Sequence, residues 1–154
     1  MNEISNIVDE AKKAYEGNAW HGPALKELLA DVTADQAASR PVPSAHSIWE
    51  IALHIAGWQS VVSLRLKGER VAEPPDGDFP PVNDKSPQAW AKALAKVESA
   101  QRDLIEQISG LQESALRQTA IGTDYTVYFM LHGVIQHTLY HAGQIAVLKK
   151  AYAF

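Results

Sequence analysis

The sequence contains no cysteine, and this absence excludes several kinds of chemistry. The protein can have no disulfide framework, no thiolate ligand for a metal and no cysteine nucleophile. Any metal must therefore be bound by histidine, carboxylate or water.

The sequence also lacks long apolar runs and an excess of positive charge. No run approaches the ~20 apolar residues that cross a bilayer, and residues 1–15 lack the continuous hydrophobic region of a signal peptide. Lys and Arg number 14 against 18 Asp and Glu, giving a formal net charge of -4, so no basic surface for nucleic acid or anionic lipid is expected. We therefore expect no nucleic-acid partner, no membrane partner and, by default, a cytoplasmic location.

The chain is long enough for one hydrophobic core. It has 154 residues, of which 46% are hydrophobic, and it shows no internal repeat and no linker between two composition types. We expect a single domain over residues 1–154.

Apolar residues recur at three- and four-residue intervals, which predicts helices throughout the chain. Ser47 and Glu50 form a capping-box pattern, and Ser86-Pro87 is an N-cap followed by proline at the first helical position. The expected helices cover residues 4–17, a short piece around Leu25–Leu29 with Pro23 in its first turn, another after Thr33, and long segments 48–66, 87–110 and 126–151. Pro41-Val42-Pro43 is expected to be extended.

The segment Gly68 to Lys85 is rich in proline and poor in apolar residues, which is typical of a long surface loop. A connection of this length allows the helices on either side to run in the same direction. The predicted fold is therefore all-α, a four-helix bundle with one long crossover loop.

The histidines carry the candidate chemistry. At ~100° per residue, His137, His141 and Gln144 lie within about 60° of one another on the apolar side of the last helix. The i, i+4 pair projects two imidazoles about 6 Å apart, but an isolated pair is more often structural. His54, beside the apolar stripe of another helix, adds a third inward imidazole and predicts a three-histidine metal site with open positions. His132 lies roughly 140° from His137 and is not expected to be a ligand.

Two segments resemble motifs of the DinB-like (DinB/YfiT) superfamily. They are the run from His137 to Ile145 and the block from Ser47 through His54 to Trp58, and the segments 15–17 and 20–23 also look like members. The resemblance covers essentially the whole chain. It implies an up-down-down-up four-helix bundle and a divalent metal, usually nickel or zinc, held by the three histidines.

The resemblance implies an activity less specifically. Some members look like metal-dependent S-transferases or isomerases that use bacillithiol, mycothiol or glutathione, so the missing cysteine is no objection when the thiol belongs to the cosubstrate. We rank this thiol-dependent transferase first. The alternatives are a hydrolase that uses a metal-bound water and a non-catalytic metal-binding or structural bundle. A homodimer is compatible with amphipathic helices.

Three further residues are candidates for the catalytic site. Gln144 can hydrogen-bond a metal-bound water or a ligand imidazole, although an ordinary interhelical amide is equally expected. Glu50 can orient His54 or accept a proton, but its capping position already accounts for it. Tyr140 can line a substrate pocket, as can Trp58, although aromatic residues at helical spacing are often simple core. Two more histidines remain: His21 is expected either to close over the site or to cap a turn, and His46 to lie on the surface.

Overall fold

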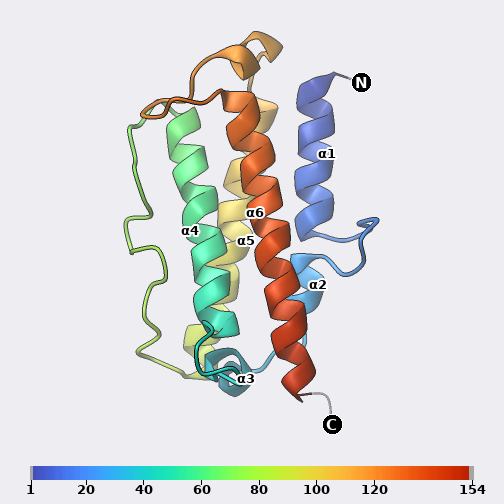
Figure 1. The fold of residues 1–154 in the computed structure, drawn as a ribbon, viewed down its shortest axis with the longest axis vertical. Coiled ribbons are helices and arrows are strands. Elements are labelled where there is room, and N and C mark those ends of the chain that lie inside the picture. Colours follow the sequence, from blue (N-terminus) through green and yellow to red (C-terminus); the bar gives the residue numbers. More distant parts are fainter. Residues whose placement is uncertain (1, 153–154) are drawn as a thin grey trace.

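The protein is all-helical in the computed structural model, which describes residues 2–152 (Figure 1). Across these residues there is no strand, and the only β pairing is an isolated bridge between Thr119 and Thr126. The elements are α1 (Glu3–Tyr15), α2 (Leu25–Leu29), α3 (Ala34–Ala38), α4 (Ile48–Leu66), α5 (Pro87–Ser109), the 3-10 helix η1 (Glu113–Arg117), α6 (Val127–Lys149) and the 3-10 turn η2 (Lys150–Tyr152). Within the same residues, none of the helices is both long and apolar enough to cross a membrane.

Local side-chain chemistry sets where the long helices begin. The hydroxyls of Ser47, Ser86 and Thr126 accept hydrogen bonds from the first turns of α4, α5 and α6. The capping box of Ser47 and Glu50 is complete, and Pro87 occupies the first position of α5. These caps satisfy backbone N–H groups that have no partner within the helix, so the predicted starts of these helices are confirmed.

The structure differs from the predicted elements in three details. Pro23 lies before the N-cap of α2, which is Ala24, and not in its first turn. The segment after Pro41 forms a turn, with Ala45 N–H donating to Val42 O at 2.9 Å, because proline favours the second position of such a turn. The last helix ends at Lys149 and tightens into η2, while η1 was not predicted.

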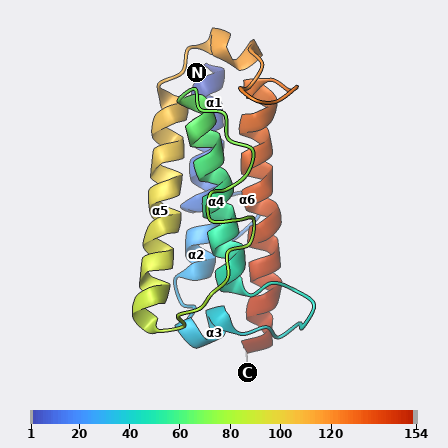
Figure 2. The ribbon, with the colours of Figure 1, turned by 90° about the vertical axis from the view of Figure 1, so that its left-hand side faces the viewer.

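Four long helices, α1, α4, α5 and α6, lie side by side along the molecule (Figures 1 and 2). The colours show α4 and α5 running in one direction and α1 and α6 in the other. Two apolar clusters fill the interior, one at the end that carries α2 and α3 and the other at the end near η1.

A buried polar layer separates the two apolar clusters. Gln59 on α4 donates to Gln101 Oε1 on α5 at 2.7 Å and lies 3.4 Å from the hydroxyl of Thr138 on α6. Gln101 Nε2 in turn donates to the carbonyl of Ala11 on α1 at 3.1 Å. The three side chains are 1–4% exposed. This layer therefore links all four long helices at one level.

The crossover loop between α4 and α5 is seated on α4 (Figure 2). The guanidinium of Arg65 donates to the carbonyls of Val71 and Ala72. Further along, Pro74 is buried against Gly57, where an added Cβ would come within 3.0 Å of the proline ring. Glycine at this mid-helix position therefore allows the loop to approach α4 closely.

We expect Gln101→Ala to lower the free energy of unfolding by about 2–3 kcal/mol, because it leaves buried polar partners unpaired and opens space in the interior. Urea denaturation followed by circular dichroism measures this change. Gln88→Ala is the matched control, since Gln88 lies on the same helix and is exposed, and its effect should stay within about 0.5 kcal/mol. Equal effects of the two substitutions would show that the layer does not stabilise the bundle.

Candidate metal centre

Three imidazoles meet between α4 and α6. His54 Nε2 lies 2.8 Å from His137 Nε2 and 3.0 Å from His141 Nε2. One ligand atom from each residue falls within 4.8 Å of the others. His54 and His141 are 5% and 7% exposed, and His137 is partly buried. The structure thus brings together the three histidines that the sequence predicted as one site.

The position of the three rings follows from helical register. His54 lies within a stretch of α4 in which Ile51, Ala52, Ile55 and Ala56 are also buried, so its ring faces the interior of the bundle. On α6, one helical turn separates His137 from His141, and both face α4. Thr138 follows His137 directly and contacts Gln59 of α4, so the polar layer links these two helices close to the histidines.

Burial keeps two of the imidazoles neutral. Burial, followed by charge repulsion from His141 and His54, lowers the pKa of His137 to about 4, against the opposite effect of the Asp78 carboxylate. Burial also lowers the pKa of His141, although its hydrogen bond to Gln144 acts in the opposite direction. Neutral imidazole is the form that binds a metal.

Hydrogen bonds on the outer side of the rings determine which nitrogen carries the proton. His54 Nδ1 lies 2.7 Å from the carbonyl oxygen of Asp78, which can only accept, so Nδ1 donates and Nε2 keeps a lone pair. His141 Nδ1 donates in the same way to Gln144 Oε1 at 2.7 Å. Two Nε2 lone pairs therefore face each other at 3.0 Å, where they cannot hydrogen-bond.

A cation at the point where these lone pairs converge would remove their repulsion. The donor set is three imidazole nitrogens with no thiolate, and two of the rings have outer hydrogen bonds of the kind that orient metal-binding histidines. Nδ1 of His137 is buried without a hydrogen-bond partner, so no contact at this atom determines which ring nitrogen carries the proton. The residues present therefore fit a divalent metal ion.

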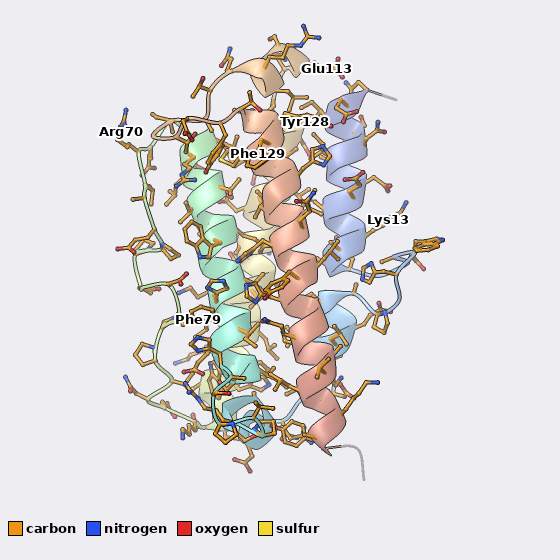
Figure 3. All side chains as sticks on the ribbon, in the orientation of Figure 1. Lys13, Arg70, Phe79, Glu113, Tyr128 and Phe129 are labelled. Carbon is orange, nitrogen blue, oxygen red and sulfur yellow. The ribbon has the colours of Figure 1, made fainter. Side chains whose placement is uncertain are left out.

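The crossover loop carries Phe79 to the side of α4 (Figure 3), where its ring lies against His54 and near His141. The ring of Phe79 stacks on His54 with centroids 3.9 Å apart and on His46 with centroids 3.6 Å apart. The carboxylate of Asp78 accepts a hydrogen bond from the indole of Trp58 at 2.8 Å and lies 3.1 Å from His54 Nδ1. The sequence predicted this loop as a crossover connection and gave it no part in the site, although Phe79 is its only aromatic residue.

The other candidate residues differ in their surroundings. Glu50 completes the capping box and accepts a hydrogen bond from Arg40 at 2.6 Å. Burial alone would raise the pKa of Glu50, but hydrogen bonds from Ser47 and Arg40 lower it overall, which weakens it as a base. Tyr140 is 67% exposed with its ring 5.0 Å from that of His141. His21 is exposed in a turn before α2.

Two histidines contact other groups. His46 is exposed as predicted, but it has partners that the sequence did not reveal, namely the ring of Phe79 and the carboxylate of Glu50, 3.7 Å from its Nδ1. His132 lies near the carboxylates of Glu3 and Glu10 on α1 and outside the three-histidine group.

Two cavities border the three histidines. A cavity of about 420 Å³ lies between α4 and α6 and is lined at one end by His54, His137 and Asp78. A second cavity of about 710 Å³ is lined by His141, Gln144, Tyr140 and Phe79. The centre can therefore be approached from two sides.

We expect Phe79→Ala to loosen the crossover loop without unfolding the helices, because it removes both ring stacks that hold the loop at this point. Limited digestion with trypsin should then cut faster at Arg70 and Lys85, while the helical circular dichroism signal is unchanged. Phe129→Ala is the control, since Phe129 is 63% exposed and lies outside the loop. Unchanged cleavage in Phe79→Ala would mean that the stacks do not anchor the loop.

Comparisons with known proteins identify the family. A family model described as the DinB superfamily matches residues 19–145, which include all three histidines and the crossover loop. A search of curated proteins gave no match. Because the model covers most of the sequence, the chain belongs to the DinB superfamily.

Proposed function

We propose that the protein is a divalent-metal-dependent enzyme in which Nε2 of His54, His137 and His141 binds the ion. The observation that supports this is the convergence of three imidazoles, two of which, His54 and His141, turn their N–H groups away from the centre. Imidazole suits both nickel and zinc, and three protein ligands leave positions open for a substrate. Nickel or zinc is therefore the proposed ion.

Within this class, we propose a thiol-dependent S-transferase. The two cavities that border the histidines allow two reactants to approach one centre from different sides, as transfer between a thiol and an electrophile requires. Since the chain has no cysteine, the thiol belongs to a low-molecular-weight cosubstrate of the bacillithiol, mycothiol or glutathione type.

The chain's own residues have distinct parts in this reaction. The bound ion would lower the pKa of the cosubstrate thiol. Gln144 and the Asp78 carbonyl hold two ligand imidazoles in the required tautomer. The Asp78 carboxylate lines the smaller cavity and is placed to accept the thiol proton. The sulfur then bonds to the electrophilic carbon as the leaving group departs with the bonding electrons. Tyr140 lines the second cavity and contacts a reactant there.

The proposal also includes the topology of the helices and the cellular compartment of the protein. The common direction of α4 and α5, joined by a long loop, supports the up-down-down-up topology. A cosubstrate that must stay a reduced thiol supports a cytoplasmic location. The homodimer stays a prediction.

We expect the purified protein to bind one divalent ion per chain and the variant His54→Ala to bind none. Metal analysis after gel filtration measures both values. His132→Ala is the matched control, because this histidine lies on α6 but outside the three-histidine group, and it should retain the ion. Full metal content in His54→Ala would remove the proposed ligand set.

We expect the metal-loaded protein to join one of the three thiols to an aryl halide, with release of the halide. His137→Ala should lower the rate by at least about 100-fold, since loss of even an outer partner of a ligand costs about 10–100-fold. Chromogenic product formation and thermal melting are followed together, with His132→Ala as control.

Three results would contradict the transferase. Ester hydrolysis that does not depend on thiol would favour the hydrolase. A large fall in melting temperature on metal removal, with no turnover of either kind, would favour a structural ion. Equal turnover by His137→Ala and the parent protein would exclude this centre from the reaction.

A further inference from the structure

The smaller cavity extends from the histidines toward a positively charged side chain. On α4, His54 and Arg65 are about three turns apart, roughly 16 Å along the axis, and lie within about 20° of each other around the helix. Both line the same cavity of about 420 Å³. The cavity is therefore a groove with the metal centre at one end and a guanidinium at the other.

The walls between these two ends are apolar. Figure 3 shows Phe129 near the start of α6, which places it about two helical turns before His137. The apolar lining residues are Trp58, Val62, Phe129, Met130 and Val134. The groove thus suits a ligand with an apolar body.

The positive charge of Arg65 has no counter-ion in the part of the chain that the structure describes. No carboxylate of residues 2–152 lies within ion-pair distance of it. Its contacts to the carbonyls of Val71 and Ala72 and to the hydroxyl of Tyr125 are all to neutral groups. Anchoring of the loop explains these three hydrogen bonds, but it does not require a charge.

Three hydrogen-bond donors remain on Arg65 and Tyr125, which both line the groove. A guanidinium carries five N–H groups, and three of those of Arg65 are used. The hydroxyl of Tyr125 accepts from Arg65 at 2.8 Å and keeps its own proton to donate, and Tyr125 also lines the groove. The Arg65 end of the groove therefore offers both a positive charge and hydrogen-bond donors to a carboxylate.

Gly133 is an independent sign that the groove is kept open. It lies inside α6, where glycine is less favourable than alanine, and an added Cβ would meet nothing within 4 Å. No packing contact therefore requires glycine. It lines the groove one turn before His137 and one turn after Phe129, so a larger side chain there would fill the space.

We propose that this groove binds an apolar monocarboxylate, with the carboxylate on Arg65 and Tyr125 and the far end of the molecule at the three histidines. In the transferase, this ligand is the electrophilic substrate, and that assignment alone rests on the proposed function. The binding site itself does not depend on the reaction.

The test measures binding of 4-phenylbutyrate and its neutral amide to the full chain by ligand-observed NMR titration. The carboxylate should bind about tenfold more tightly than the amide, because a charge-assisted hydrogen bond is roughly twice as strong as a neutral one. Arg65→Gln should remove this preference, because it weakens binding of the carboxylate more than binding of the amide. Gly133→Leu should block both probes, whereas Gly143→Leu, the same substitution beside the other cavity, should block neither.

The remaining outcomes would overturn the proposal. They are no binding by the parent protein, no preference for the carboxylate, equal weakening of both probes in Arg65→Gln, and unchanged binding in Gly133→Leu. Repeating the titration with His54→Ala separates this site from the metal. If His54→Ala loses the preference for the carboxylate while Arg65→Gln retains it, the carboxylate binds the ion, and the role of Arg65 is refuted. A preference retained in His54→Ala would support the groove even if the protein has no transferase activity.

Discussion

The site depends on three imidazole nitrogens that face one another with no proton between two of them. The lone pairs of His54 and His141 repel each other at 3.0 Å, and a cation at the centre would remove this repulsion. The carbonyl of Asp78 and the amide of Gln144 hold the protons of His54 and His141 on the outer side. A tautomer change that paired the two rings would leave one of these outer acceptors without a donor.

The rest of the bundle maintains the distance between α4 and α6 that this arrangement needs. The layer of Gln59, Gln101 and Thr138 lies beside the histidines and links the helices by directional hydrogen bonds, which apolar packing alone would not supply. The crossover loop adds the outer cover, since its path along α4 places Asp78 and Phe79 against His54. The loop is held to α4 at several points by Arg65, Pro74 and Phe79.

Sequence patterns predicted the helices and the three-histidine group because both depend on local rules. N-cap residues such as Ser47 and Ser86 act within one turn, and the spacing of His137 and His141 places both rings on one face. The contacts of Asp78 and Arg65 could not be predicted in this way. They depend on the path of the loop over α4, which is set by tertiary contacts distant in sequence.

Glycines in the middle of α4 and α6 mark the positions where the loop or a cavity meets these helices, and the spacing of apolar residues does not reveal them. Gly57 faces Pro74 of the loop, where a Cβ would come within 3.0 Å, while Gly133 and Gly143 would each meet nothing within 4 Å and line the two cavities. Glycine lowers helix stability by about 1 kcal/mol relative to alanine, so each position needs a reason outside the helix itself. At Gly57 that reason is close approach of the loop. At Gly133 and Gly143 it is open space beside the histidines, and the position of these residues on α6 therefore points to the same centre as the ligand geometry.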